Sequence, residues 1–192
     1  MNKQIILSGI EKLQSTLSQL KMRVFVIDDV LRQWNDNMEL TREVETVNVA
    51  VFAKEIHTDL FKVLDKANIT VKDTFGTTEC GLKLSLEVVP DMMSIDSTDA
   101  TCKINLYFVY ESPINNFYHV DWIGPVADTK NLYQMHVNTY ERFRLKKVHL
   151  HSLTILVPKH VPEFLEARYG KDFDLDTKLQ KPEPSTIVFA KS

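Results

Sequence analysis

The most constraining feature of this chain is the stretch 46–52, in which valines recur at every second position. In an extended backbone, alternate side chains point to opposite faces, so the three valines would share one face. This alternation predicts a strand that buries its valine face. The following residues, 54–67, place apolar side chains at three- and four-residue steps, which predicts an amphipathic helix directly after the strand.

Similar patterns predict the other elements of the fold. Residues 3–20 carry an apolar face with helical spacing, and the region after Val157 predicts a helix that ends at Gly170. Further strands are expected at 23–27, 81–88, 102–110, 117–122, 132–137 and 150–157. These elements predict an α/β (α+β) protein with a mixed, mostly antiparallel sheet flanked by helices.

Length and charge narrow the class of protein. With 192 residues, the chain is expected to form a single domain over 1–175, followed by a charged, proline-containing surface tail over 176–192. The net charge of −3 gives no reason to expect a nucleic-acid partner. No apolar run approaches the about 20 residues that span a bilayer, so no membrane association is expected.

The N-terminal residues and the cysteines bear on the cellular compartment. The first residues lack the continuous apolar core of a secretory signal, so a cytoplasmic location is expected. Cys80 and Cys102 lie in strand-like runs, and without a signal peptide we expect two buried thiols. Neither is expected at the exposed turn or helix start where a nucleophilic thiol is typically found.

Three segments together resemble the fukutin and LicD family of phosphosugar transferases. The first is the strand, helix and Phe-Gly unit over 47–76, the second is the strand 102–110, and the third is the Val-Pro to Tyr-Gly segment over 157–170. The resemblance covers roughly residues 23–175. It implies a nucleotidyltransferase-like mixed β-sheet flanked by helices.

The same resemblance implies that the metal site of the family is missing. In the family, the strand corresponding to 46–52 carries two acidic residues, and the strand corresponding to 102–110 carries a third. Thr46, Asn48 and Asn105 stand at these positions. Mg²⁺ gives up its water mainly for anionic ligands, so no catalytic triad, metal or cofactor is expected here.

The phosphate-binding turn of the family is also degraded. The family pattern Gly-Thr-Leu-Leu-Gly-Trp-x-Arg follows the first strand, whereas this chain has a segment that starts with Asp28 and Asp29 and ends with Asp36. Only Leu31 and Trp34 match. The glycines that let a phosphate approach the backbone are absent, and a carboxylate repels a phosphate.

These observations predict a catalytically inactive binding or scaffolding protein that keeps the transferase fold. Its partner would be another protein, or an uncharged or weakly phosphorylated small ligand held by Thr46, Asn48 and Asn105. The other possible ligand-binding residues are Asp28, Asp29, Trp34 and Tyr107. One alternative is an active phosphosugar or nucleotidyl transferase, for phosphoalditol or phosphocholine transfer, in which Asp28, Asp29 and Asp121 hold Mg²⁺. Another is an interaction subunit of a larger complex.

Histidines and aromatic residues are weaker candidates for a metal site or a ligand pocket. His149 and His151 share a strand face, and His119 or His136 could join them, but the spacing of a zinc site is absent. Surface or partly packed histidines are therefore expected. A group of aromatic residues could form a ligand pocket or be ordinary sheet residues: Tyr107, Tyr110, Tyr118 and Trp122.

Overall fold

The computed structural model describes residues 1–90, 101–124, 132–171 and 188–190. The helices of this part of the chain are α1 (Lys3–Ser18), α2 (Asp28–Asn37), α3 (Leu60–Lys66) and α4 (Val161–Tyr169), with a 3₁₀ turn η1 (Ala53–Glu55). The strands are β1 (Phe25–Val26), β2 (Val47–Phe52), β3 (Ile69–Phe75), β4 (Lys83–Val88), β5 (Cys102–Glu111), β6 (Phe117–Ile123), β7 (Leu132–Tyr140), β8 (Leu145–Leu150), β9 (Leu153–Pro158) and β10 (Val188–Ala190).

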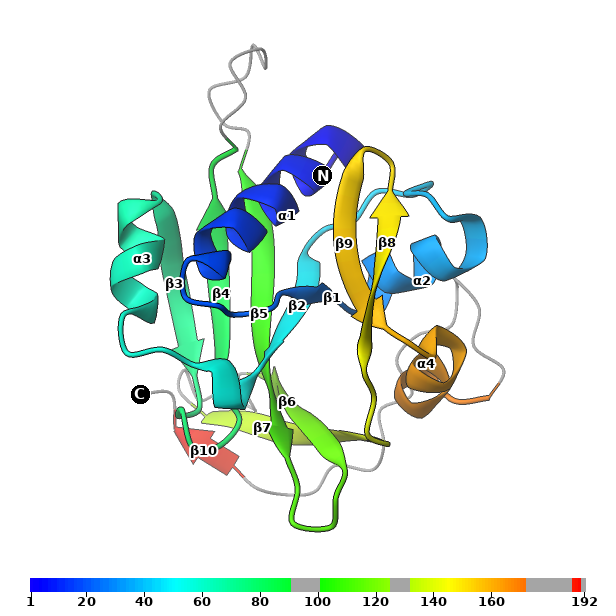
Figure 1. Ribbon diagram of the computed structural model, residues 1–192. Helices are drawn as coiled ribbons and strands as arrows, with labels where there is room; N and C mark the ends of the chain where they lie inside the picture. Colours follow the sequence, from blue (N-terminus) through cyan, green and yellow to red (C-terminus); the bar gives the residue numbers. More distant parts are fainter. Residues whose placement is uncertain (91–100, 125–131, 172–187, 191–192) are drawn as a thin grey trace.

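These strands form one mixed sheet, which confirms the expected fold class. The order along the sheet is β10-β7-β6-β5-β2-β1-β9-β8, and β4 pairs with both β5 and β3. The pairs β2–β5 and β1–β9 are parallel, and the other described pairs are antiparallel. In Figure 1, α1 lies across β4 and β5, whereas α2 and α4 lie together beside β8 and β9. Among the described residues, no helix is long and apolar enough to cross a bilayer.

Strand β2 lies at the centre of this sheet, between β5 and β1. The prediction that its valines are buried is confirmed, but the opposite face is largely buried as well, at Ala50 and Phe52. Phe52 packs against Phe25 and Phe117, with ring centroids 5.4 and 5.2 Å apart. Within β2, Asn48 is the half-buried exception, so this strand has one position at which a polar side chain reaches a less enclosed environment.

Helix α1 approaches the sheet unusually closely at Gly9. A Cβ atom at this position would lie 2.5 Å from both Cβ and Sγ of Cys102 on β5. We therefore expect Gly9→Ala to destabilise the protein by up to about 2 kcal/mol, because overpacking costs about 1–3 kcal/mol and the gain in helix propensity is only about 1 kcal/mol. Urea unfolding would measure this change. Glu11→Ala, at an exposed position of the same helix, is the control and should be nearly neutral; equal stability of both variants would contradict the prediction.

Two of the expected elements differ in the structure. The helix expected over 54–67 is reduced to η1 and the short α3, because the chain turns at 57–59, where the His57 ring accepts the N–H of Asp59 at 3.1 Å. The segment expected as a degraded phosphate turn from Asp28 onward is helix α2. The predicted end of the last helix is confirmed: Gly170, with φ of 91°, donates its N–H to Glu166 at 2.8 Å.

The cysteine prediction is wrong for one of the two residues. Both thiols are free, but Cys80 is exposed in the turn between β3 and β4, whereas Cys102 is buried. Burial raises the pKa of Cys102 to about 12, so that thiol remains protonated. Most of the tail expected at 176–192 lies outside the described residues. Within that tail, Val188–Ala190 form β10, which pairs with β7.

Candidate functional site

Polar side chains from three neighbouring strands form a hydrogen-bonded row across the sheet. The strand register places Asn105 of β5 beside Asn48 of β2 and Ser85 of β4. Ser85 donates to Oδ1 of Asn105 at 3.2 Å, and Asn105 Nδ2 donates to Oδ1 of Asn48 at 3.0 Å. The two asparagines that the sequence paired are therefore in direct contact. Thr46 lies one residue before β2 and outside this row.

The row continues to Asp28 at the start of α2. Asn48 Nδ2 donates to Oδ2 of Asp28 at 2.9 Å, and the Asp28 side chain is only 3% exposed. The Asp28 backbone has φ of 53°, a left-handed conformation that costs a residue other than glycine about 1–2 kcal/mol and that aspartate tolerates better than most. Asp28 thus adopts a conformation that glycine would adopt without strain, and its carboxylate points into the sheet region.

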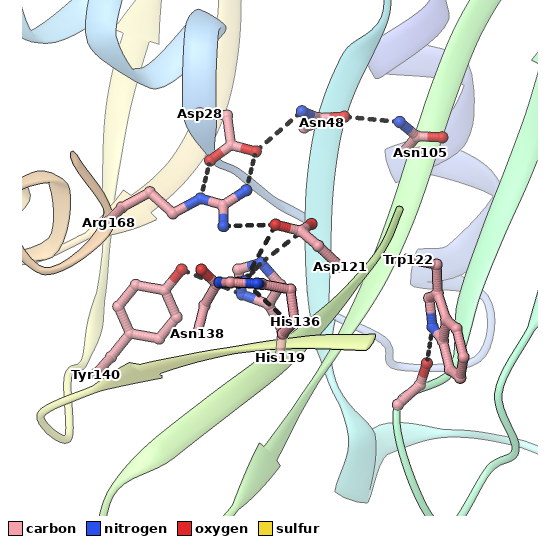
Figure 2. A network of polar contacts seen from close by, with 11 residues as sticks. Asp28, Asn48, Asn105, His119, Asp121, Trp122, His136, Asn138, Tyr140 and Arg168 are labelled. Atoms are coloured by element: carbon pink, nitrogen blue, oxygen red, sulfur yellow. Dashed lines mark hydrogen bonds and ion pairs between the residues drawn. The ribbon is translucent and has the colours of Figure 1, made fainter. Parts of the chain in front are cut away.

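Arg168 of α4 joins two carboxylates that are far apart in the sequence (Figure 2). Its Nε and Nη2 donate to Oδ1 and Oδ2 of Asp28 at 2.9 and 3.2 Å, and its Nη1 donates to Oδ2 of Asp121 on β6 at 2.6 Å. The Arg168 side chain is 2% exposed and that of Asp121 is 15% exposed. Burial by itself would raise the pKa of Asp121, but Arg168 holds it below its usual value. Burial also opposes the charge of Arg168, and the two carboxylates raise its pKa well above the ordinary value.

Side chains of the β6–β7 hairpin surround Asp121 and contact its carboxylate. Asn138 donates to Oδ2 of Asp121 at 3.1 Å. Nε2 of His119 lies 3.9 Å from Oδ1 of Asp121, and Nδ1 of His119 lies 3.1 Å from the Tyr140 hydroxyl. Nδ2 of Asn138, which can only donate, lies 3.5 Å from Nε2 of His119, so the tautomer that fits both contacts has Nε2 accepting and Nδ1–H donating to the Tyr140 hydroxyl. Burial lowers the pKa of His119 to about 4, with a further contribution from Arg168, so this imidazole is neutral near pH 7.

Three more side chains border this cluster. Nζ of Lys83 on β4 lies 5.1 Å from the centre of the Tyr107 ring and 5.5 Å from that of Phe75, and the Tyr107 ring lies 5.0 Å from that of His119. Burial lowers the pKa of Lys83 and raises that of Tyr107. His136 on β7 is opposite Asp121 in the strand register. We call the following set the polar centre: Asp28, Asn48, Lys83, Ser85, Asn105, Tyr107, His119, Asp121, His136, Asn138, Tyr140 and Arg168.

Two residues that the sequence suggested as possible ligand-binding residues, Asp29 and Trp34, lie outside the polar centre. Asp29 has a side chain 59% exposed, and it pairs with Arg32 at 3.5 Å. Trp34 is buried on α2 and donates from Nε1 to the carbonyl of His149 at 2.9 Å, so its contacts tie α2 to β8.

The expectation of surface or partly packed histidines is wrong for two of them. His119 and His136 are 1% and 6% exposed and belong to the polar centre. His149 is exposed on β8, whereas His151 accepts the N–H of Leu40 at 3.0 Å. Within the described residues, no group of three or more His, Cys, Asp or Glu side chains is arranged to hold a metal ion.

The aromatic residues proposed as a pocket do not share one face. Tyr107 points to the polar centre, whereas Tyr110 stacks on Tyr118 with ring centroids 5.4 Å apart. Trp122 donates from Nε1 to the carbonyl of Gly81 at 2.9 Å. Period-two alternation explains the separation of Tyr107 from Tyr110, since they are three positions apart on β5.

The residues of the polar centre that sequence reasoning missed come from α4, β4 and β7; those on β7 are Asn138 and Tyr140. Arg168 was assigned only to a helix, and Lys83 and Ser85 only to a strand. A signal for the strand residues existed, because Lys83 and Ser85 alternate with buried leucines and share the face of the two asparagines across the register. No local signal linked Arg168 to Asp28, which is 140 positions away.

The donor set of the polar centre does not suit Mg²⁺. At the row across the sheet, the oxygens belong to neutral amides and a hydroxyl, and the amide oxygens of Asn48 and Asn105 already accept hydrogen bonds. Asp28 and Asp121 carry the negative charges, but both bind Arg168. Mg²⁺ prefers anionic oxygen ligands in octahedral geometry, and a divalent ion would have to displace a buried guanidinium.

Fold and site together define a mixed α/β protein with a largely buried cluster of charged and amide side chains beside its central strand. No family model matches the chain. Over 163 residues it is 22% identical to ribitol-5-phosphate transferase FKTN of Macaca fascicularis; the match covers 85% of this chain and 32% of that protein. The similarity indicates a distant fukutin-like relationship, and the chain spans about a third of the length of this relative.

Proposed function

We propose that this chain is a fukutin-like domain that does not catalyse phosphosugar transfer and acts instead as a binding or scaffolding protein. The observation that carries this proposal is the ion triad, in which the guanidinium of Arg168 binds both Asp28 and Asp121. Phosphoryl transfer depends on cations that bridge enzyme carboxylates and substrate phosphates. Here the cation between the carboxylates is part of the protein itself.

The energetics of the triad favour this proposal. Arg168 makes two hydrogen bonds to Asp28 and one to Asp121, and all three side chains are at most 15% exposed. Removing one partner from such a buried pair costs about 3–5 kcal/mol, because the other charge is left uncompensated. A metal ion would have to displace Arg168, and so overcome this cost, before it could bind the two carboxylates.

One observation favours a second candidate function. Asp28 and Asp121, two of the three acids named above as alternative metal ligands, do converge on one point. If Arg168 moved aside, they could hold Mg²⁺ in an active phosphosugar or nucleotidyl transferase. Asp29 would not contribute in the present arrangement, since its side chain is exposed on α2.

A metal titration separates the two candidates. We expect Mg²⁺ or Mn²⁺, added with a nucleotide diphosphate-alditol, to leave the melting temperature of the unaltered protein unchanged and to release no binding heat. The matched variant is Asn48→Asp with Asn105→Asp, which restores acids at the two amide positions. We expect this variant to be less stable without metal, because of repulsion from Asp28, and to be stabilised by Mn²⁺. Metal-dependent stabilisation of the unaltered protein, abolished by Asp121→Asn, would refute the proposal in favour of an active transferase.

A further inference from the structure

Strand β8 lies at one end of the sheet, and among residues 1–90, 101–124, 132–171 and 188–190 no strand pairs with its outer edge (Figure 1). Its inner edge pairs with β9 in an unbroken antiparallel register over 145–150. An unpaired edge presents backbone N–H and C=O groups that can form hydrogen bonds with another chain. The outer edge of β8 is therefore a candidate interaction surface.

The hydrogen bonds near the two ends of β8 show which of its residues face outward. The carbonyl of Arg144, just before the strand, accepts the N–H of Lys159 at 2.7 Å, so Arg144 faces β9. The residues of an antiparallel strand alternate between its two edges. Near the other end, the carbonyl of His149 accepts a hydrogen bond from Nε1 of Trp34 on α2 at 2.9 Å, which agrees with this alternation. The residues whose backbone groups face the outer edge are Leu145, Lys147 and His149.

Most of these outward backbone groups have no partner. Apart from the His149 carbonyl, they make no hydrogen bond to any residue that the structure describes. Lys147 and His149 are exposed, and Leu145 is half-buried. A partner can therefore reach the backbone along most of this edge without displacing an existing contact.

The β8–β9 hairpin is basic, although the whole chain has a net charge of −3. The stretch 144–162 contains no aspartate or glutamate. Its lysine and arginine side chains are all exposed, and none of them forms an ion pair with another described residue. These side chains are Arg144, Lys146, Lys147 and Lys159. The hairpin thus carries positive charge that the described part of the protein does not neutralise, and this charge favours an acidic partner.

An extended acidic segment fits both features of this edge. Its backbone can pair with the outward N–H and C=O groups, and its alternate side chains would lie beside Lys146 on one face and Lys147 on the other. Opposite charges across neighbouring strands are stabilising, whereas like charges are destabilising. A second copy of this chain fits poorly, because antiparallel pairing of two β8 edges would bring the lysines of both copies together.

We propose that the outer edge of β8 binds an acidic segment of a partner protein, which joins the sheet as an additional strand. The N–H and C=O groups of Lys147 form the central pair of hydrogen bonds, and the N–H groups of Leu145 and His149 extend the pairing. This surface contains no residue of the polar centre. The inference therefore goes beyond the proposed function and is correct or incorrect independently of it.

The test uses the full chain and a short fluorescent peptide in which aspartate and valine alternate. We expect a saturable rise in fluorescence anisotropy, together with slower amide exchange, followed by NMR, at Leu145, Lys147 and His149. Lys146 and Val148 should keep their exchange rates, because their amides face β9. The same peptide with every backbone nitrogen methylated keeps its charges but cannot donate backbone hydrogen bonds, and it should not bind.

A charge reversal on the edge tests the contribution of the lysines. Lys147→Glu should weaken binding of the peptide by about tenfold, because it places a like charge beside the acidic side chains. Lys62→Glu makes the same change of charge at a side chain that is 67% exposed on α3, far from β8 in Figure 1. This control variant should bind the peptide as the unaltered protein does.

Several results would overturn the inference. Equal binding of the methylated peptide would show that charge alone attracts the ligand, and equal binding by Lys147→Glu and the unaltered protein would remove β8 from the contact. Tighter binding of a DNA oligonucleotide or of anionic lipid vesicles would assign the basic hairpin to another partner. Lysines at a sheet edge can also prevent pairing with other chains, and no change in anisotropy would show that they do so here. The metal titration described above tests the polar centre separately.

Discussion

Replacing Arg168 with methionine is expected to lower the free energy of unfolding by about 3–5 kcal/mol. Methionine keeps much of the side-chain volume and removes the charge. Asp28 and Asp121 would then lose the guanidinium that binds both of them, in a site where their side chains are 3% and 15% exposed. Urea unfolding followed by circular dichroism at pH 7 would measure the loss.

The control for this experiment is Arg142→Met. Arg142 pairs with Glu111, but its side chain is 46% exposed, so the loss should be within about 1 kcal/mol. Combining Arg168→Met with Asp28→Asn and Asp121→Asn should recover much of the stability, because the neutral amides remove the repulsion. A loss below about 1 kcal/mol for Arg168→Met alone would show that the triad is not the buried ion cluster described here.

Acid is expected to destabilise the protein through His119. The pKa of this imidazole is about 4 in the folded state, chiefly because of burial, and about 6.5 in the unfolded chain. Between these values the unfolded chain binds a proton that the folded protein does not, so stability falls as the pH is lowered from 6.5 to 4. The loss amounts to about 3 kcal/mol, at 1.36 kcal/mol per pKa unit.

The variant His119→Gln should flatten this dependence, although it lowers stability at pH 7 by weakening the contact with Tyr140. Stability measured by urea unfolding at several pH values between 4 and 7 gives the slope. His160→Gln, at a side chain 64% exposed, is the control and should keep the slope of the unaltered protein. Asp121 contributes its own acid sensitivity at lower pH, since Arg168 depresses its pKa. Identical slopes for His119→Gln and the unaltered protein would contradict the prediction.

Local patterns were sufficient for most strands and for the fold class. The alternation over 46–52 corresponds to β2, and that over 81–88 to β4. The end of helix α4 at Gly170 was also predictable, since glycine readily adopts the positive φ found there. The helix expected over 54–67 was too long because its apolar spacing continued through the turn at 57–59, where a side-chain hydrogen bond breaks the helix.

For the candidate site, some of the residues could be named from the sequence, but their arrangement could not. Asn48 and Asn105 were paired correctly, because both were matched to acidic positions on neighbouring strands. Asp28 and Asp121 were named only as possible metal ligands, and the structure shows that both bind Arg168. His119 and His136 were expected near the surface, since a histidine in a strand carries no local mark of burial.

What the sequence by itself determined is therefore the set of extended and helical segments, together with the neutral side chains of Asn48 on β2 and Asn105 on β5. These are properties of consecutive residues, because backbone geometry imposes periods of 2 and 3.6 on whatever is buried. Only the tertiary structure decided that Arg168 meets carboxylates 140 and 47 positions away. Such an ion cluster depends on how α2, α4 and the β6–β7 hairpin pack together. The residue pattern within one segment does not show which charged side chain a distant segment will place beside it.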